Sequence, residues 1–254
     1  MKRVLLLLGL VVLSVVSSYS VVISDCSSNL SVSGETYFLD SPVVGQNCNI
    51  TSSNVAFNCQ DNSLSNMDIY IIALGHISIS NCNLANVSVT SFISTLNNLT
   101  LRNISVDNLD QTKNFISFSI DNSLIKNISG NNFNFFIDGS ISNSSFFNIY
   151  GENMVGGFNS GFGMDNVQFN TINLTSGINH GIYITGTSSE HVLIENSYFS
   201  NFSDGIVIFP GADNITIRNS LFENNSFGIR FDVTNSFNPV TNAYVYNNTI
   251  RYGY

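Results

Sequence analysis

The 254-residue chain has no tryptophan, three prolines and few charged residues, which make up only 10% of it. Lys and Arg number eight against 17 Asp and Glu, so the net charge of −9 opposes binding to DNA, RNA or anionic lipid. We therefore expect no nucleic-acid partner. Helix-forming Ala, Glu, Lys and Leu are scarce, which argues against a helical protein, while 43% hydrophobic residues are too many for a disordered one. A β-rich protein remains.

Long hydrophobic runs are also missing, apart from one at the start. Met1, Lys2 and Arg3 precede an apolar run from Val4 to Val16, which predicts a signal peptide over residues 1–20. The run is shorter than the ~20 residues of a spanning helix, so we expect removal and no membrane-spanning segment afterwards. Losing two cations would take the charge from −9 to −11. The expected location is extracellular or on the cell surface.

Cysteine is limited to four residues, all in the first third of the chain: Cys26, Cys48, Cys59 and Cys82. An even number of cysteines in a secreted chain predicts disulfides. Four cysteines allow three connectivities; we expect the first two to pin an N-terminal cap over residues 21–53 and the last two to join neighbouring coils. Without a Cys-x-x-Cys motif or paired histidines, no zinc site is expected from them.

What the sequence has in abundance is asparagine at regular intervals. The segments 191–208 and 214–231 repeat one pattern, an Asn with an apolar residue two positions before it, at an offset of 23 residues. Nine such Asn can be marked, at 58, 81, 103, 122, 143, 166, 196, 219 and 247. Apolar and polar residues alternate in the strands on either side of each marked Asn, so one face of each strand would point into a core. This pattern predicts a parallel β-solenoid of about nine coils over 54–254. The same alignment predicts four stacked rings: Phe146, Phe169, Phe199 and Phe222.

A second Asn follows most marks after five residues, and we expect both columns to form asparagine ladders at the turns. Twelve Asn-x-Ser/Thr sequons occur, and seven fall in these columns, where we expect burial to prevent glycosylation. The expected acceptors are the other five: Asn29, Asn49, Asn98, Asn173 and Asn214.

This repeat, Ile-x-Ile-x-Asn followed by Phe or Ile, Asn and Gly-Ile, resembles the right-handed parallel β-helix repeat family of the pectate-lyase-like and periplasmic copper-protein-like kind. The predicted cap, with Cys26, Gly34, Tyr37-Phe38-Leu39, Cys48 and the segment 54–59, also resembles the entry segment of its secreted prokaryotic members. That family includes lyases, hydrolases, epimerases, adhesins and inert surface proteins, so the resemblance implies a fold and leaves the function open. No copper site is expected. His76 and His191 share a column but lie five coils apart, about 24 Å at the strand spacing, and His180 is on another strand.

The outward column one residue before each mark places Asp165, Glu195 and Arg218 on successive coils. The resemblance implies a lyase-like site in which the two carboxylates hold Ca2+, Arg218 faces a sugar, and the seven extra residues of this coil form a cleft wall. The column has fewer charged residues than such lyases, which weighs against catalysis. His180 and Asp204 share another column, and a hydrogen-bonded turn pair is favoured there over a hydrolase dyad.

The favoured function is a non-catalytic scaffold or adhesin that presents an elongated polar surface to polysaccharide or cell-envelope components. One alternative is a Ca2+-assisted polysaccharide lyase or glycoside hydrolase. Another is a carbohydrate-binding module that stacks sugars on Tyr183, Tyr198 and Tyr244. No polar cap follows Ile250, so we expect further chain or an end-to-end partner to cover the last coil.

Overall fold

The computed structural model describes most of the chain beyond the predicted signal peptide. The described residues are 20–72, 76–91, 96–97, 99–107, 115–117, 120–121, 123–131, 135–137, 140–152, 158–160, 163–175, 179–185, 189–232 and 238–252. Every regular element among them is a β-strand. Within those ranges no helix is long and apolar enough to cross a bilayer.

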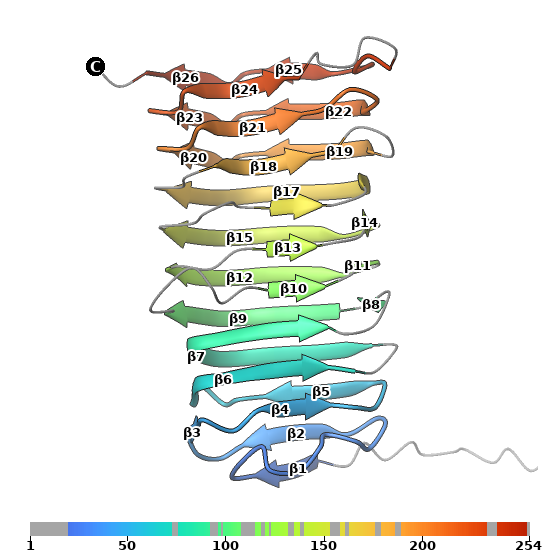
Figure 1. Ribbon diagram of the computed structural model, residues 1–254, viewed down its shortest axis with the longest axis vertical. Coiled ribbons are helices and arrows are strands. Elements are labelled where there is room, and N and C mark those ends of the chain that lie inside the picture. The colour runs from blue at the N-terminus through green and yellow to red at the C-terminus, as the bar shows by residue number, and fades with distance from the viewer. Residues whose placement is uncertain are drawn as a thin grey trace, which may run out of the picture.

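The strands form one continuous parallel network, coiled from β1 at one end of the molecule to β26 at the other (Figure 1). Their bounds are β1 Ser20–Ile23, β2 Thr36–Leu39, β3 Val43–Val44, β4 Cys48–Ile50, β5 Val55–Asn58, β6 Ser63–Ile71, β7 Ile77–Ser91, β8 Leu96–Asn97, β9 Leu99–Asp107, β10 Phe115–Ser117, β11 Ile120–Asp121, β12 Leu124–Asn131, β13 Phe135–Ile137, β14 Ser140–Ser142, β15 Ser145–Glu152, β16 Phe158–Ser160, β17 Gly163–Thr175, β18 His180–Ile184, β19 Glu190–Glu195, β20 Tyr198–Ser200, β21 Asp204–Ile208, β22 Asp213–Arg218, β23 Leu221–Glu223, β24 Phe227–Phe231, β25 Tyr244–Tyr246 and β26 Thr249–Arg251. The predicted parallel β-helix is therefore confirmed.

Three faces run along the solenoid, and each is a ladder of in-register segments. Face 1 contains 55–58, 77–80, 99–102, 124–126, 145–147, 168–170, 193–195, 216–218 and 244–246. Face 2 contains 63–65, 83–85, 104–107, 128–131, 149–152, 172–175, 198–200, 221–223 and 249–251. Face 3 contains 48–50, 69–71, 89–90, 115–117, 135–137, 158–160, 182–184, 206–208 and 229–231.

Left-handed residues make the corners on both sides of face 1. The corner before it, the first corner, has positive φ at Asn54, Asn143, Asn166, His191, Asn214 and Asn242. The second corner, after face 1, has positive φ at Asn81, Asn127, Asn148, Thr171, Asn196, Asn219 and Asn247. Asn tolerates this conformation better than most residues, which explains its recurrence. Some corner amides also join neighbouring windings; Asn148 Nδ2, for example, donates to Asn127 Oδ1 at 3.1 Å.

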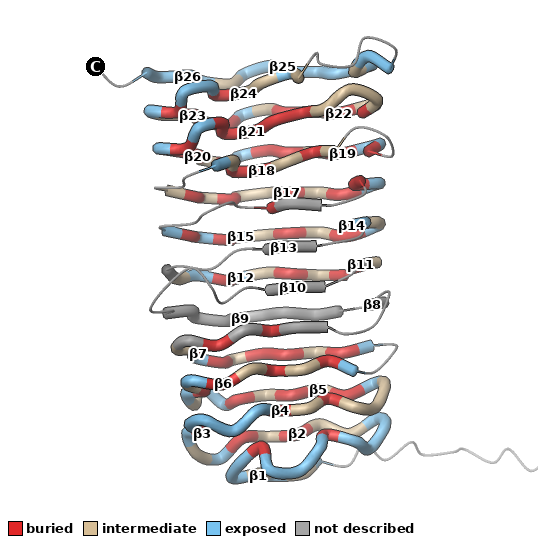
Figure 2. The backbone as a smooth tube through the Cα atoms, viewed as in Figure 1, coloured by how far each residue is buried: buried red, intermediate tan, exposed pale blue. Residues whose placement is uncertain are grey.

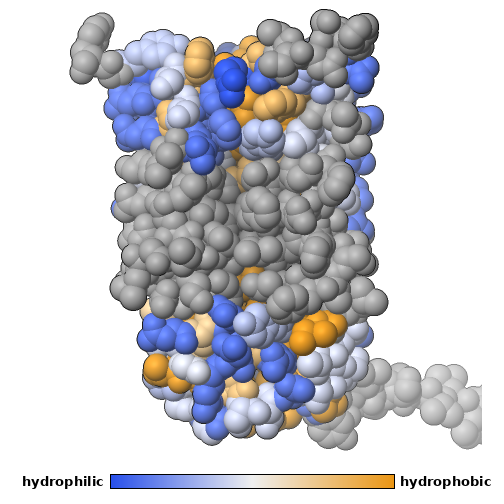
Figure 3. Space-filling view, in the orientation of Figure 1, coloured by the Kyte–Doolittle hydropathy of each residue, from blue (hydrophilic) through white to orange (hydrophobic). Residues whose placement is uncertain are grey.

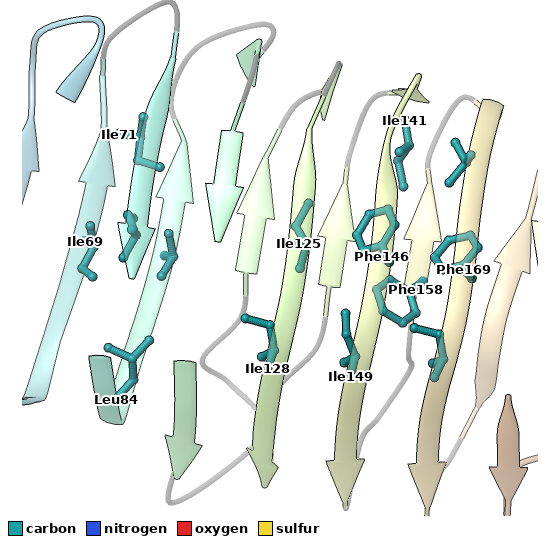
Figure 4. Close-up of a cluster of buried hydrophobic side chains, with 14 of the residues drawn as sticks. Ile69, Ile71, Leu84, Ile125, Ile128, Ile141, Phe146, Ile149, Phe158 and Phe169 are labelled. Atoms are coloured by element: carbon teal, nitrogen blue, oxygen red, sulfur yellow. The ribbon is translucent and has the colours of Figure 1, made fainter. Parts of the chain in front are cut away.

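Inside the solenoid, buried aliphatic and aromatic residues form one hydrophobic cluster, a column that extends from Cys26 to Phe222. Figure 2 shows buried positions recurring in the described windings. Ile194 is in register with Ile217, and the rings of Phe199 and Phe222 stack 5.4 Å apart, as predicted. Figure 4 shows part of the column, where Phe158 of face 3 meets the rings of Phe146 and Phe169 edge-on at 5.1 and 5.0 Å.

The predicted stack of four phenylalanine rings is wrong. Phe146 stacks on Phe169 at 4.9 Å, but the next residue in register with Phe169 is Ile194. Phe199 instead follows Leu174, so there are two stacked pairs on two different faces.

The cause is a slip of one whole strand in the predicted alignment. In the structure Asn103 is followed at the second corner by positions 127, 148, 171 and 196, whereas Asn143 and Asn166 belong to the first corner. Asn122 lies outside the described residues. The two corner positions are five residues apart, and Asn stands at nearly all of them in these windings, with Thr171 and His191 as the exceptions, so the sequence matches either alignment. In the predicted alignment, successive marked Asn are 19 residues apart at the start of the slip and 30 apart at its end. In the structure, the corresponding second-corner positions are 24 residues apart (103 to 127) and 25 apart (171 to 196), so the long coil with seven extra residues does not exist.

The segment predicted as the N-terminal cap joins the same ladders. β2 pairs in parallel with β1 and with β5, and β3 and β4 both pair with β6. The Asn repeat is absent here because these first windings turn through other residues, including Gly34 and Gly45 at positive φ.

The corner explanation can be tested at Asn219, which is exposed and has a φ of 53°. We expect Asn219→Val to lower the free energy of unfolding by about 1–2 kcal/mol, because a β-branched side chain is strained in the left-handed region. Asn219→Gly should cost much less. Urea denaturation of the two variants gives the difference, and equal losses would contradict the explanation.

Candidate functional site

Glu195 and Arg218, two of the predicted site residues, pair on the outside of face 1. Arg218 donates to Glu195 Oε2 from Nε at 2.9 Å and from Nη2 at 2.7 Å. The other oxygen, Oε1, accepts from Asn170 at 2.8 Å and from Gln168 at 3.3 Å. Glu195 is 9% exposed, so this buried carboxylate is fully engaged by its neighbours.

Asp165 does not join them, so the predicted column of Asp165, Glu195 and Arg218 is wrong. Its partner in register is Glu190, while Glu195 is in register with Asn170. Asp165 precedes the first corner and Glu195 precedes the second, which is a consequence of the same one-strand slip. The predicted arrangement, with Ca2+ held between Asp165 and Glu195, has no geometric basis.

Asp165 lies instead with Glu190 and His191 just before and at the first corner. One ligand atom from each of the three side chains lies within 4.8 Å of those of the other two. His191 Nδ1 is 3.5 Å from Asp165 Oδ1, and both side chains are 57% exposed. Among the described residues, these are the ones that could hold a metal ion.

His180 and Asp204 are neighbours in register, as predicted, and a third residue completes the group. Arg230 donates to both oxygens of Asp204, from Nε at 2.8 Å and from Nη2 at 3.0 Å. His180 Nδ1 lies 2.8 Å from Asp204 Oδ2, although not at a hydrogen-bonding angle. The Asp204 side chain is 4% exposed. Three windings thus meet at one buried carboxylate.

Arg230 and Glu190 were missed in the sequence, although a signal for Arg230 was present. One glycine recurs in each of three successive windings, as Gly181, Gly205 and Gly228. This glycine sets the register between these windings for the residues that follow it. A Cβ at Gly205 would come within 2.6 Å of the Phe222 ring, so the chain needs glycine there. Counting on from Gly228 places Arg230 on the same face as Asp204.

Aromatic side chains surround this group on the outside of face 3. The ring of Tyr183 lies 5.3 Å from that of His180 and 4.8 Å from that of Phe209. Arg230 lies over the ring of Phe227, which is 55% exposed. Burial raises the pKa of Tyr183, and the Asp232 carboxylate raises it further, so its hydroxyl remains a neutral hydrogen-bonding group at physiological pH.

Both predicted disulfides are present and join neighbouring windings. Cys26 and Cys48 have Cα atoms 4.8 Å apart, and those of Cys59 and Cys82 are 4.9 Å apart. This separation is that of adjacent strands and lies within disulfide range. Disulfides of this kind indicate folding in an oxidising, extracellular type of environment.

We expected the sequon Asn residues in the turn columns to be buried and the other five to be accessible, and this is wrong for the described residues. The turn residues Asn127, Asn143, Asn201, Asn224 and Asn247 are exposed, because the corners project outward. Among the expected acceptors, Asn29 is exposed, whereas Asn49, Asn173 and Asn214 are partly buried. Asn98 lies outside the described residues, and the use of any sequon stays a prediction.

No protein-family model and no curated protein matches the sequence. Two solved structures are similar, the A-modules of the Azotobacter vinelandii mannuronan C-5 epimerases AlgE4 and AlgE6. The first is 11% identical, with a TM-score of 0.37 over 92% of this chain and 87% of the other; the second is 12% identical, with a TM-score of 0.35 over 92% and 90%. At TM-scores below 0.5, neither similarity bears on the function of this chain.

The role of Asp204 as a link between windings can be tested by replacing it with Asn. Asp204→Asn keeps the shape but removes the carboxylate that accepts two hydrogen bonds from Arg230, which then keeps only its longer contact of 3.7 Å with Asp232. We expect a loss of roughly 3 kcal/mol in unfolding free energy. Arg251→Ala is the matched control, since Arg251 is 63% exposed and lies 3.8 Å from Glu223. Its loss should stay below about 1 kcal/mol in the same denaturation experiment. Equal losses would contradict the role given to Asp204.

Proposed function

We propose that this chain is a non-catalytic extracellular scaffold that presents its outer faces to polysaccharide. The observation that carries the proposal is that its buried carboxylates are engaged in hydrogen bonds between windings. Glu195 and Asp204 each accept hydrogen bonds from neighbouring windings. Carboxylates held in this way connect coils and are poorly placed to exchange protons with a substrate.

The exterior also favours a binding role. Hydrophilic side chains predominate among the described residues on the face drawn in Figure 3. The predicted signal peptide and the two disulfides favour export to the outside of the cell.

Face 3 offers the best surface for a sugar. Tyr183, Phe209 and Phe227 provide aromatic rings, and the partly exposed side chains of His180 and Arg230 lie beside them. Saccharides are bound by this combination, because their C–H faces stack on rings while their hydroxyls form hydrogen bonds. We name these five residues the aromatic patch. The excess of acid over base in the chain favours neutral glycans as its partners.

A glycan array followed by a turnover assay tests the proposal. The chain should retain a subset of neutral glycans, and it should release no product from them or from acidic polysaccharides with Ca2+ present. Tyr183→Ala should weaken retention at least tenfold by removing the central ring. Tyr198→Ala, which changes a tyrosine on face 2, should have no effect. Product release would contradict the scaffold role, and unchanged retention by Tyr183→Ala would contradict the aromatic patch.

A further inference from the structure

The first corner carries one group of side chains that the scaffold role does not use. Asp165 comes from β17, while Glu190 and His191 come from β19 on the next winding. Their ligand atoms lie within 4.8 Å of one another, so small rotations of these exposed side chains would bring them to the roughly 3.3 Å that separates the ligands of a tetrahedral Zn2+ ion. Two carboxylates and an imidazole therefore converge from two windings.

The same position in two other windings shows what this group replaces. Asp121 Oδ1 accepts from the hydroxyl of Ser142 at 2.8 Å and from the amide of Asn143 at 3.0 Å, both on the next winding. Asp213 Oδ1 accepts in the same way from Thr241 at 2.7 Å and from Asn242 at 2.8 Å. A hydroxyl and an amide are thus the usual donors to an acid at this position.

At Asp165 the hydroxyl is replaced by Glu190 and the amide by His191. Glu190 brings a second negative charge beside the first, where the other windings provide a donor. Like charges opposite each other on adjacent strands are destabilising. Asp213 follows Glu190 in register, so three acids lie on consecutive windings. The substitution exchanges a hydrogen-bonding pair for two metal ligands, and a cation would remove the repulsion.

We propose that Asp165, Glu190 and His191 bind a divalent metal ion of the Zn2+ class and so join β17 to β19. Imidazole and carboxylate together are a common donor set for such ions, and three protein ligands leave further positions for water. Ca2+ is a poorer fit, since it prefers six to eight oxygen ligands and the group includes a nitrogen. The site is separate from the aromatic patch and from the Glu195–Arg218 pair.

Calorimetric titration of the metal-free chain with ZnCl2 tests the proposal. We expect one Zn2+ per chain with a dissociation constant in the micromolar range, and at least tenfold weaker binding of CaCl2. Saturating Zn2+ should raise the unfolding temperature, because the ion binds only the folded arrangement of the two windings. An absence of stoichiometric Zn2+ binding, or tighter binding of Ca2+, would overturn the proposal.

Variants taken from the chain's own corners separate metal binding from folding. The double change Glu190→Ser with His191→Asn copies Ser142 and Asn143, so the metal-free variant should fold and be at least as stable as the parent. It should lose Zn2+ binding at least a hundredfold. Asp165→Asn, which removes the ligand on the other winding, should also lose Zn2+ binding at least a hundredfold.

His76→Asn is the control. His76 is exposed at the same corner five windings away, and its replacement should leave Zn2+ affinity unchanged. Circular dichroism confirms the fold of each variant. Zn2+ binding retained by the double variant, or lost equally in His76→Asn, would show that the ion binds elsewhere.

Discussion

The backbone hydrogen bonds in the faces of this protein join one winding to the next, because parallel strands of the same face belong to successive windings. Among the described strands every ladder is parallel, so none is held by the tight turn that sets the pairing of a hairpin. Register is therefore the constraint on which the structure depends. The corner asparagines maintain it by turning the chain at the same point of each winding, and stacked side chains in the interior make any other register costly.

Much of this fold could be predicted from the sequence. The period, the alternation around each Asn and the positions of the cysteines were sufficient for a parallel solenoid with disulfides between neighbouring windings. The alignment of the middle windings was not predictable in the same way, because faces 1 and 2 read alike. Ile77 and Ile79 follow His76 as Cys82 and Leu84 follow Asn81, with all four side chains buried. A five-residue shift thus preserves both the corner residues and the buried pattern.

Predicting the candidate sites required the correct alignment of the windings, whereas predicting the fold did not. Glu195 and Arg218 lie in the C-terminal windings, where the alignment was right, and they pair as neighbours. Asp165 lies in the middle windings, and the shift moved it from Glu190 to Glu195 in the prediction. His180 with Asp204 was found because the Gly after each residue allows only one alignment. Charge pairs between windings can therefore be inferred only where a feature other than Asn sets the register.

The distance between the two corners has a wider consequence. From His76 onward the first and second corners are five residues apart wherever the structure describes both corner residues. The return from a described second corner to the next described first corner takes from 16 to 23 residues. Face 1 thus has a constant length, whereas the segment from the second corner to the next first corner varies. Insertions or deletions can accumulate in that segment without disturbing neighbouring windings. Such a molecule can diversify its loops, or accept a grafted epitope, one turn at a time.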